Sequence, residues 1–171
     1  MEIELESAFK EIKLSIIDTI KKHPPERENV YSCGFWLFYC DYSMLGTPCF
    51  AYNIEGEYED DTKWCPPEWV VDVEDSMIDA LEPHYEKISE LMAGKSDEAW
   101  EDLVKYQYEF YCNLCLQLND MSNTDNSPFK NWNTTNDFVI GVFEEREGEE
   151  LYDELVKLSV GSSREKALEI C

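Results

Sequence analysis

The sequence predicts an α+β domain in which helices cover a small antiparallel or mixed sheet of about three or more strands. Apolar residues recur at helical spacing over the first 23 residues and again from residue 66 to residue 118. Segments rich in aromatic and β-branched residues, typical of buried strands, lie at residues 30–40, 47–54 and 137–143. The expected order is therefore α-β-β-α-α-β-α. At 171 residues and 43% hydrophobic content, the chain fits a single domain, residues 1–171.

The first helix and the first two strands follow from simple patterns. The helix ends at Pro24-Pro25, because proline cannot continue it. Val30–Cys40 carries apolar side chains on both alternating faces, which is typical of a central strand. Thr47–Ile54 is expected to pair with it, after a loop that contains Gly46. The apolar stripe of the helix consists of Leu5, Phe9, Ile12, Ile16 and Ile20.

Two long helices and a third strand are expected next. Pro66 and Pro67 open one helix, which Pro83 is expected to kink or restart and which ends near Gly94. Ser96 is the predicted N-cap of the following helix. The apolar stripes are Val70, Val73, Met77, Leu81, Tyr85, Ile88, Leu91 and Met92 in the first, and Trp100, Leu103, Val104, Tyr111, Leu114, Cys115 and Leu118 in the second.

The end of the chain is expected to hold one more strand and two short helices. A polar loop at residues 122–136 precedes the third strand, Asp137–Phe143. Two short helices finish the chain, and the last begins at a capping box from Ser162 to Glu165.

The charge of the chain is strongly negative and concentrated in one segment. The sequence has 38 acidic and 14 basic residues, a net charge of −24 and a pI near 4.2. Eleven acidic residues lie between Glu55 and Glu82, where Lys63 is the single base. Nucleic acid and anionic membranes would be repelled, so we expect neither as a partner. A basic protein, a cation or no partner remains.

Part of this charge has helical spacing. A solvated acidic face is the simplest interpretation. Like charges at that spacing destabilise a helix, however, so a function such as docking a basic partner is weighed against it. The spacing is +4, +3, +4, +3 through Glu68, Asp72, Asp75, Asp79 and Glu82. The preceding loop supplies a second acidic patch, Glu57, Glu59, Asp60 and Asp61. Trp64 and Trp69 are candidate apolar anchors for a partner, although tryptophan packs more often at the edge of a core.

Evidence for catalysis or metal binding is weak. His23 and His84 are the two histidines, and each adjoins a proline outside any motif of a catalytic base. Cys112 and Cys115 form a C-x-x-C without the second pair that a structural zinc site needs. The acidic loop lacks the glycine and the terminal glutamate of an EF-hand. We therefore expect no enzymatic activity, no cofactor and no bound metal.

The cysteines and the N-terminus bear on the compartment. Seven cysteines, an odd number, favour free thiols in a reducing cytoplasm. The N-terminal segment begins with acidic residues and lacks the apolar run of a secretory signal. No stretch reaches the length needed to span a membrane.

Four segments carry a family resemblance: FWLFYCDYS from Phe35, PCFAYNIEGE from Pro48, KWCPPEW from Lys63 and DFVIGVFEE from Asp137. Together they resemble a bacterial family of domains of unknown function encoded in polymorphic-toxin immunity loci. The landmark is a K-W-x-x-P-E-W pattern, formed by Lys63, Trp64, Pro67, Glu68 and Trp69. The resemblance spans most of the chain and implies a small cytoplasmic protein, in a family of which some members neutralise a cognate toxin. It brings no catalytic residues.

The leading functional hypothesis is a non-enzymatic immunity-type protein that binds a basic toxin domain, for example a nuclease, through its acidic surface. One alternative is a nucleic-acid mimic or regulatory adaptor that binds several basic host proteins. Another is a carboxylate- or metal-dependent hydrolase that uses the acidic loop. An acidic surface that serves solubility alone is the simplest interpretation.

Overall fold

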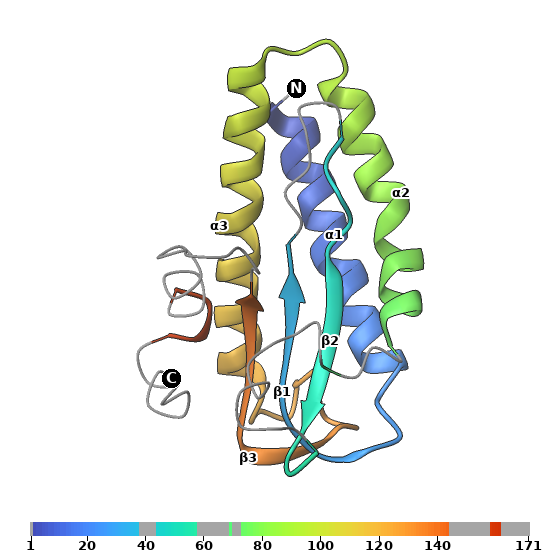
Figure 1. Ribbon diagram of the computed structural model, residues 1–171, viewed down its shortest axis with the longest axis vertical. Coiled ribbons are helices and arrows are strands. Elements are labelled where there is room, and N and C mark those ends of the chain that lie inside the picture. The colour runs from blue at the N-terminus through green and yellow to red at the C-terminus, as the bar shows by residue number, and fades with distance from the viewer. Residues whose placement is uncertain (1, 38–43, 58–68, 70–72, 144–157, 162–171) are drawn as a thin grey trace.

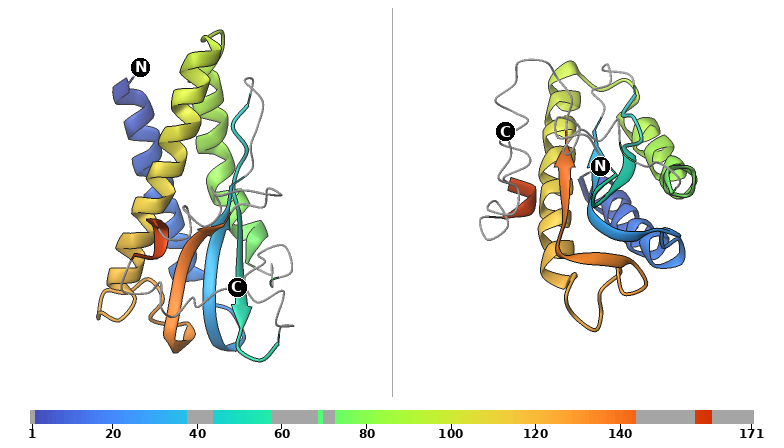
Figure 2. Two further views of the ribbon diagram at one scale, coloured as in Figure 1. Left: turned by 60° about the vertical axis from the view of Figure 1, so that its left-hand side comes forward. Right: turned by 60° about the horizontal axis from the view of Figure 1, so that its bottom comes forward.

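The computed structural model describes residues 2–37, 44–57, 69, 73–143 and 158–161. These residues form three long helices, α1 (Glu2–Lys22), α2 (Glu74–Met92) and α3 (Asp97–Met121), and three strands, β1 (Glu28–Trp36), β2 (Cys49–Ile54) and β3 (Asn133–Phe143). The sheet has the order β2-β1-β3, and β1 pairs antiparallel with β2 and parallel with β3. The three helices lie along one face of the sheet (Figures 1 and 2). The predicted α+β class is confirmed, with a mixed sheet.

Helix α1 packs its predicted apolar stripe against the rest of the core. Phe9, Ile12, Ile16 and Ile20 are at most 1% exposed. The helix ends at Lys22, two residues before Pro24, as expected. In the described part of the chain, none of the helices is long and apolar enough to cross a membrane.

Strand β1 is the central strand and is buried on both faces. The ring of Phe35 lies 4.9 Å from the ring of Tyr111 in α3, so this side chain faces the helices. Ser32 and Gly34 alternate with it and face the other way, and both are also buried. The central position was predicted from the apolar side chains on both faces. Residues 38–40 of the predicted strand lie outside the described residues.

Strand β3 forms an edge of the sheet, and side chains occupy the backbone groups along that edge. Asn119 of α3 donates from Nδ2 to the carbonyl oxygen of Ile140 at 2.7 Å. Its Oδ1 accepts from the backbone N–H of Ile140 at 3.0 Å. Ser159, in a short helical stretch at residues 158–160, accepts from the N–H of Val142 at 2.9 Å. The last strand begins at Asn133, four residues before the predicted start.

Helix α2 continues through Pro83, so the alternative in which the helix restarts there is wrong. Proline has no N–H, so the carbonyl of Asp79 loses its usual partner within the helix. The helix ends near Gly94 as predicted, with φ of +73° at that glycine. Its predicted start at Pro66-Pro67 lies outside the described residues.

The start of α3 agrees with the predicted N-cap, and polar side chains connect this helix to α2. The side chain of Ser96 accepts from the N–H of Ala99 at 3.4 Å, which confirms the predicted N-cap. A buried polar contact joins the two helices, because the hydroxyls of Tyr85 and Tyr111 lie 2.9 Å apart. Gln107 donates to the Tyr85 hydroxyl at 3.3 Å. The capping box predicted at residues 162–165 lies outside the described residues.

Candidate functional site

The exposed side of α2 carries a continuous row of carboxylates. At about 100° per residue, its five members fall within roughly 80° of the helix circumference, opposite the buried side of the helix. All five side chains are exposed. We call this row the acidic face of α2; its members are Asp75, Asp79, Glu82, Glu86 and Glu90.

Two members of the acidic face were missed in the sequence. Glu86 and Glu90 continue the +4 spacing from Glu82. A helix restarted at Pro83 would change the direction in which later side chains point. The unbroken helix keeps all five carboxylates on one side.

The acidic face carries an uncompensated charge within the described part of the chain. None of its five carboxylates forms an ion pair with another described residue. The nearest base on the helix itself is Lys87, which is exposed and precedes Glu90 by three residues, about 60° of rotation away. The face therefore offers a strong excess of negative charge to solvent or to a partner.

Of the remaining predicted binding residues, the structure describes Glu57 and Trp69. Glu57 is exposed in the turn after β2, and its carboxylate lies 3.7 Å from Arg27, whose side chain is half exposed. Such an exposed ion pair contributes little. Trp69 is 5% exposed, so its side chain belongs to the core and presents little surface to a partner. The others, Glu59, Asp60, Asp61, Trp64, Glu68 and Asp72, lie outside the described residues.

A pocket of about 360 Å³ lies at the end of the helical layer where α1 begins, α2 ends and α3 begins. At this end the helices extend beyond the described strands (Figure 1). Leu5 and Glu6 of α1 and Met92 of α2 line it on one side. Helix α3 contributes Ala99, Asp102, Leu103 and Tyr106. No local sequence pattern predicts this pocket, because its wall comes from three helices whose relative positions depend on tertiary packing.

A smaller hollow of about 250 Å³ follows between α1 and α3. Tyr106 lines both hollows. A hydrogen bond from Lys13 to Gln117 joins the two helices beside the smaller one. Polar side chains make up more of the lining of the smaller hollow, so the larger pocket is the more apolar of the two.

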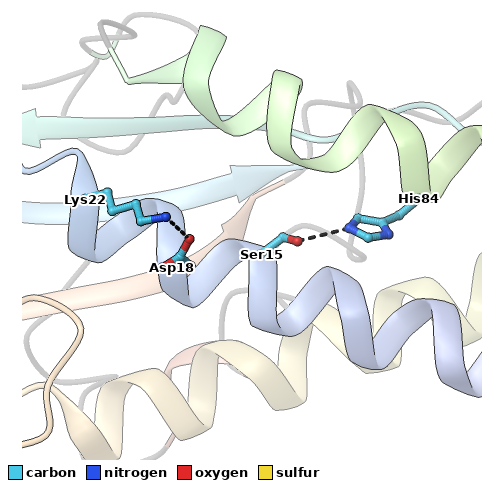
Figure 3. A network of polar contacts seen from close by, with 4 residues as sticks. All are labelled: Ser15, Asp18, Lys22 and His84. Carbon is cyan, nitrogen blue, oxygen red and sulfur yellow. Dashed lines mark hydrogen bonds and ion pairs between the residues drawn. The ribbon is translucent and has the colours of Figure 1, made fainter.

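The two histidines lie where α1 meets α2. Nε2 of His84 in α2 lies 3.0 Å from the hydroxyl of Ser15 in α1 (Figure 3). Asp18, also in α1, forms an ion pair with Lys22 at 2.7 Å and does not contact the histidine. A serine–histidine pair used for nucleophilic catalysis is normally oriented by a third group. The described residues place no carboxylate on His84. We interpret the contact as a link between the two helices.

The described thiols are poor nucleophiles. Burial raises the pKa of Cys33 and Cys115 well above the ordinary value. Burial, and then the charge of Glu109, raise the pKa of Cys112 to about 11. Thiols with such pKa values stay protonated at neutral pH, whereas a nucleophile or metal ligand needs the thiolate. Among the described residues there is no cluster of histidine, cysteine, aspartate and glutamate that would hold a metal ion.

Comparison with protein-family models, curated proteins and solved structures finds no match to this chain. The acidic face of α2 and the pocket at the end of the helical layer are the two features of the described residues that bear on function.

Proposed function

We propose that this protein is a non-enzymatic immunity-type protein that binds and neutralises a basic toxin domain, for example a nuclease. The acidic face of α2 is the observation that carries the proposal. Five exposed carboxylates in one row repel one another and weaken their own helix. Lysine and arginine side chains of a partner would relieve that repulsion.

The chemistry of the partner follows from the charge. A nuclease holds nucleic-acid phosphates with basic groups, and a row of carboxylates can occupy the same groups. The net charge of −24 would also speed the encounter with a basic protein, since complementary fields raise association rates. Neutralisation would then result from blocking the substrate site of the toxin.

The partner-binding surface is centred on Asp75, Asp79 and Glu82, with Glu86 and Glu90 extending it toward the end of α2. Glu57 belongs to the second acidic patch that the sequence predicts. The proposed surface also keeps the predicted acidic residues that lie outside the described part of the chain. These are Glu59, Asp60 and Asp61 of the second patch, and Glu68 and Asp72 at the predicted start of the helix.

The experiment that tests the proposal starts with a pull-down from a lysate of the source organism, washed first at low and then at moderate salt. We expect one basic protein, encoded beside this chain, to remain bound and to lose its toxic activity in a purified mixture. A crowd of basic proteins that washes away with salt would favour the nucleic-acid mimic or adaptor instead.

A charge-matched pair of variants then locates the surface. Asp79→Asn, Glu86→Gln and Glu90→Gln together should weaken binding of the purified partner by about ten-fold or more, mainly through slower association. The control removes three exposed carboxylates elsewhere, through Asp120→Asn, Asp125→Asn and Asp137→Asn. Equal effects of both variants would contradict binding through the acidic face.

A further inference from the structure

The pocket at the end of the helical layer combines an apolar floor with a negatively charged rim. Met92 and Leu103 are 1% and 4% exposed and form part of the floor. Glu6 and Asp102 line the same pocket with exposed side chains. The ring of Tyr106, which is 41% exposed, lies on its wall. At about 360 Å³, the pocket falls at the lower end of the usual range for ligand sites.

The charge of the rim restricts what the pocket can bind. It has no basic lining residue among the described residues, and neither Glu6 nor Asp102 forms an ion pair with another described residue. An anionic ligand would be repelled. A wholly apolar ligand would cover carboxylates without offering them a hydrogen bond, which is costly. A ligand with an apolar stem and a cationic end fits both parts.

We propose that this pocket receives an arginine side chain of the basic partner. The inference rests on the proposed function and names the residue that anchors the partner. The aliphatic stem of arginine packs on Leu5 and Ala99, the partly buried apolar residues that line the pocket, as such stems do on apolar surfaces. The guanidinium then donates to Glu6 and Asp102.

The tyrosine favours arginine over lysine. A planar guanidinium stacks on an aromatic ring, whereas a lysine ammonium is a compact and strongly hydrated charge. Buried arginine anchors are also common among the residues that dominate binding energy at protein interfaces. Tyr106 therefore has a role in selecting the cation, beyond forming part of the wall.

The pocket lies beside the last turn of α2, which also carries Glu90, the final member of the acidic face. Side chains two residues apart point about 160° from one another around a helix, so the acidic face and the pocket lie on different sides of α2. Both carry exposed carboxylates, and this shared negative charge is the reason for assigning the occupant of the pocket to the same basic partner.

The test uses N-acetyl-arginine amide as the probe, with N-acetyl-citrulline amide and N-acetyl-lysine amide as comparisons. Binding is followed through the NMR signals of ¹³C-labelled methyl groups of Met92, Leu103 and Ala99 at about 150 mM salt, which weakens nonspecific ionic attraction. We expect saturable shifts with the arginine probe and at least about five-fold weaker binding of the other two. Citrulline has a similar shape without the charge, so equal binding of citrulline would overturn the proposal, and equal binding of lysine would overturn the assignment to arginine.

Matched variants on α3 separate the pocket from general charge. Asp102→Asn should weaken the arginine probe about five-fold, while Asp120→Asn, an exposed aspartate near the other end of the same helix, should leave it unchanged. Tyr106→Leu should narrow the preference for arginine over lysine. Shifts that are absent at Met92 and Leu103, or that respond equally to both aspartate variants, would contradict the site.

The two proposals can fail separately. The acidic-face variant Asp79→Asn, Glu86→Gln, Glu90→Gln should keep its binding of the arginine probe within about two-fold at this salt concentration. If the partner binds to the acidic face but the probe does not enter the pocket, the arginine assignment fails and the proposed function stands. If the probe enters the pocket and no partner depends on the acidic face, the proposed function fails.

Discussion

The side-chain amide of Asn119 pairs with both backbone groups of Ile140, as a neighbouring strand would. Its Nδ2 donates to the Ile140 carbonyl at 2.7 Å, and its Oδ1 accepts from the Ile140 N–H at 3.0 Å. Exposed edge strands can pair with other chains and aggregate. Asn119 from α3 and Ser159 therefore occupy the outward backbone groups of Ile140 and the N–H of Val142 and block this part of the sheet edge.

Replacing Asn119 should destabilise the fold strongly. Asn119→Ala leaves a buried N–H and a buried carbonyl of Ile140 without partners, and we expect a loss of about 2–3 kcal/mol in the free energy of unfolding. Urea denaturation measures it. Asn113→Ala, an exposed asparagine on the same helix, is the control and should cost under about 0.5 kcal/mol. Similar losses in the two variants would show that the edge contact contributes little.

The indole of Trp132 should contribute through one hydrogen bond as well as through packing. Its Nε1–H donates to the carbonyl of Ile20 at 3.0 Å, near the end of α1 where carbonyls lack partners within the helix. Trp132→Phe should therefore cost about 1 kcal/mol more than Trp100→Phe, which removes the same ring volume from another buried tryptophan. Thermal unfolding of both variants checks this, and equal melting temperatures would count against the bond.

Stability should fall in alkali because of the buried thiols. Burial raises the pKa of Cys33 and Cys115, whereas an unfolded thiol ionises near pH 8.5. The contribution of these protonated thiols to the free energy of unfolding is fully present below about pH 8.5. It is lost as the pH rises above that value, because the thiols then ionise in the unfolded chain before they ionise in the folded protein. Each should lower the free energy of unfolding by about 1.4 kcal/mol per pH unit there.

Urea denaturation under reducing conditions, between about pH 8 and pH 10.5, measures this slope. The double variant Cys33→Ala, Cys115→Ala should show a shallower slope, whatever its absolute stability. An unchanged slope in that variant would mean that these thiols do not link folding to pH.

Cys49 should react slowly, and Glu74 should be part of the cause. Burial, and then a hydrogen bond and the negative charge of Glu74, raise the pKa of this thiol to about 12. Glu74→Gln removes the charge and should lower the pKa, so alkylation of Cys49 by iodoacetamide should become faster at about pH 8. Peptide mass spectrometry measures the rate at this one cysteine. Asp75→Asn makes the same change in charge at the next residue and should have a smaller effect.

Local patterns predicted most of the fold. The stripe in α1, the N-cap at Ser96 and the glycine after α2 each depend on a few neighbouring residues, and each is confirmed. The sequence left an antiparallel and a mixed sheet open, and the structure has the mixed one. The direction of β3 depends on where the chain lies after α2 and α3, which no local pattern specifies.

The candidate site was predictable only in part. Asp75, Asp79 and Glu82 follow from spacing alone, while Glu86 and Glu90 required knowing that α2 continues through Pro83. The pocket depends on tertiary packing, since Glu6 and Asp102 are far apart in the sequence and meet only when α1 and α3 are side by side. The burial of Trp69 likewise follows from tertiary packing, which its neighbours in the sequence do not reveal.

The central position of β1 has a consequence for biosynthesis. One side of this strand is paired by β2, which begins 13 residues after β1 ends, but the other side waits for β3, roughly a hundred residues later. At ordinary rates of translation that delay is about 5–20 s. For that time the growing polypeptide exposes an unpaired, apolar strand to the ribosome surface and to chaperones, so both should strongly influence how much of this protein reaches its native state.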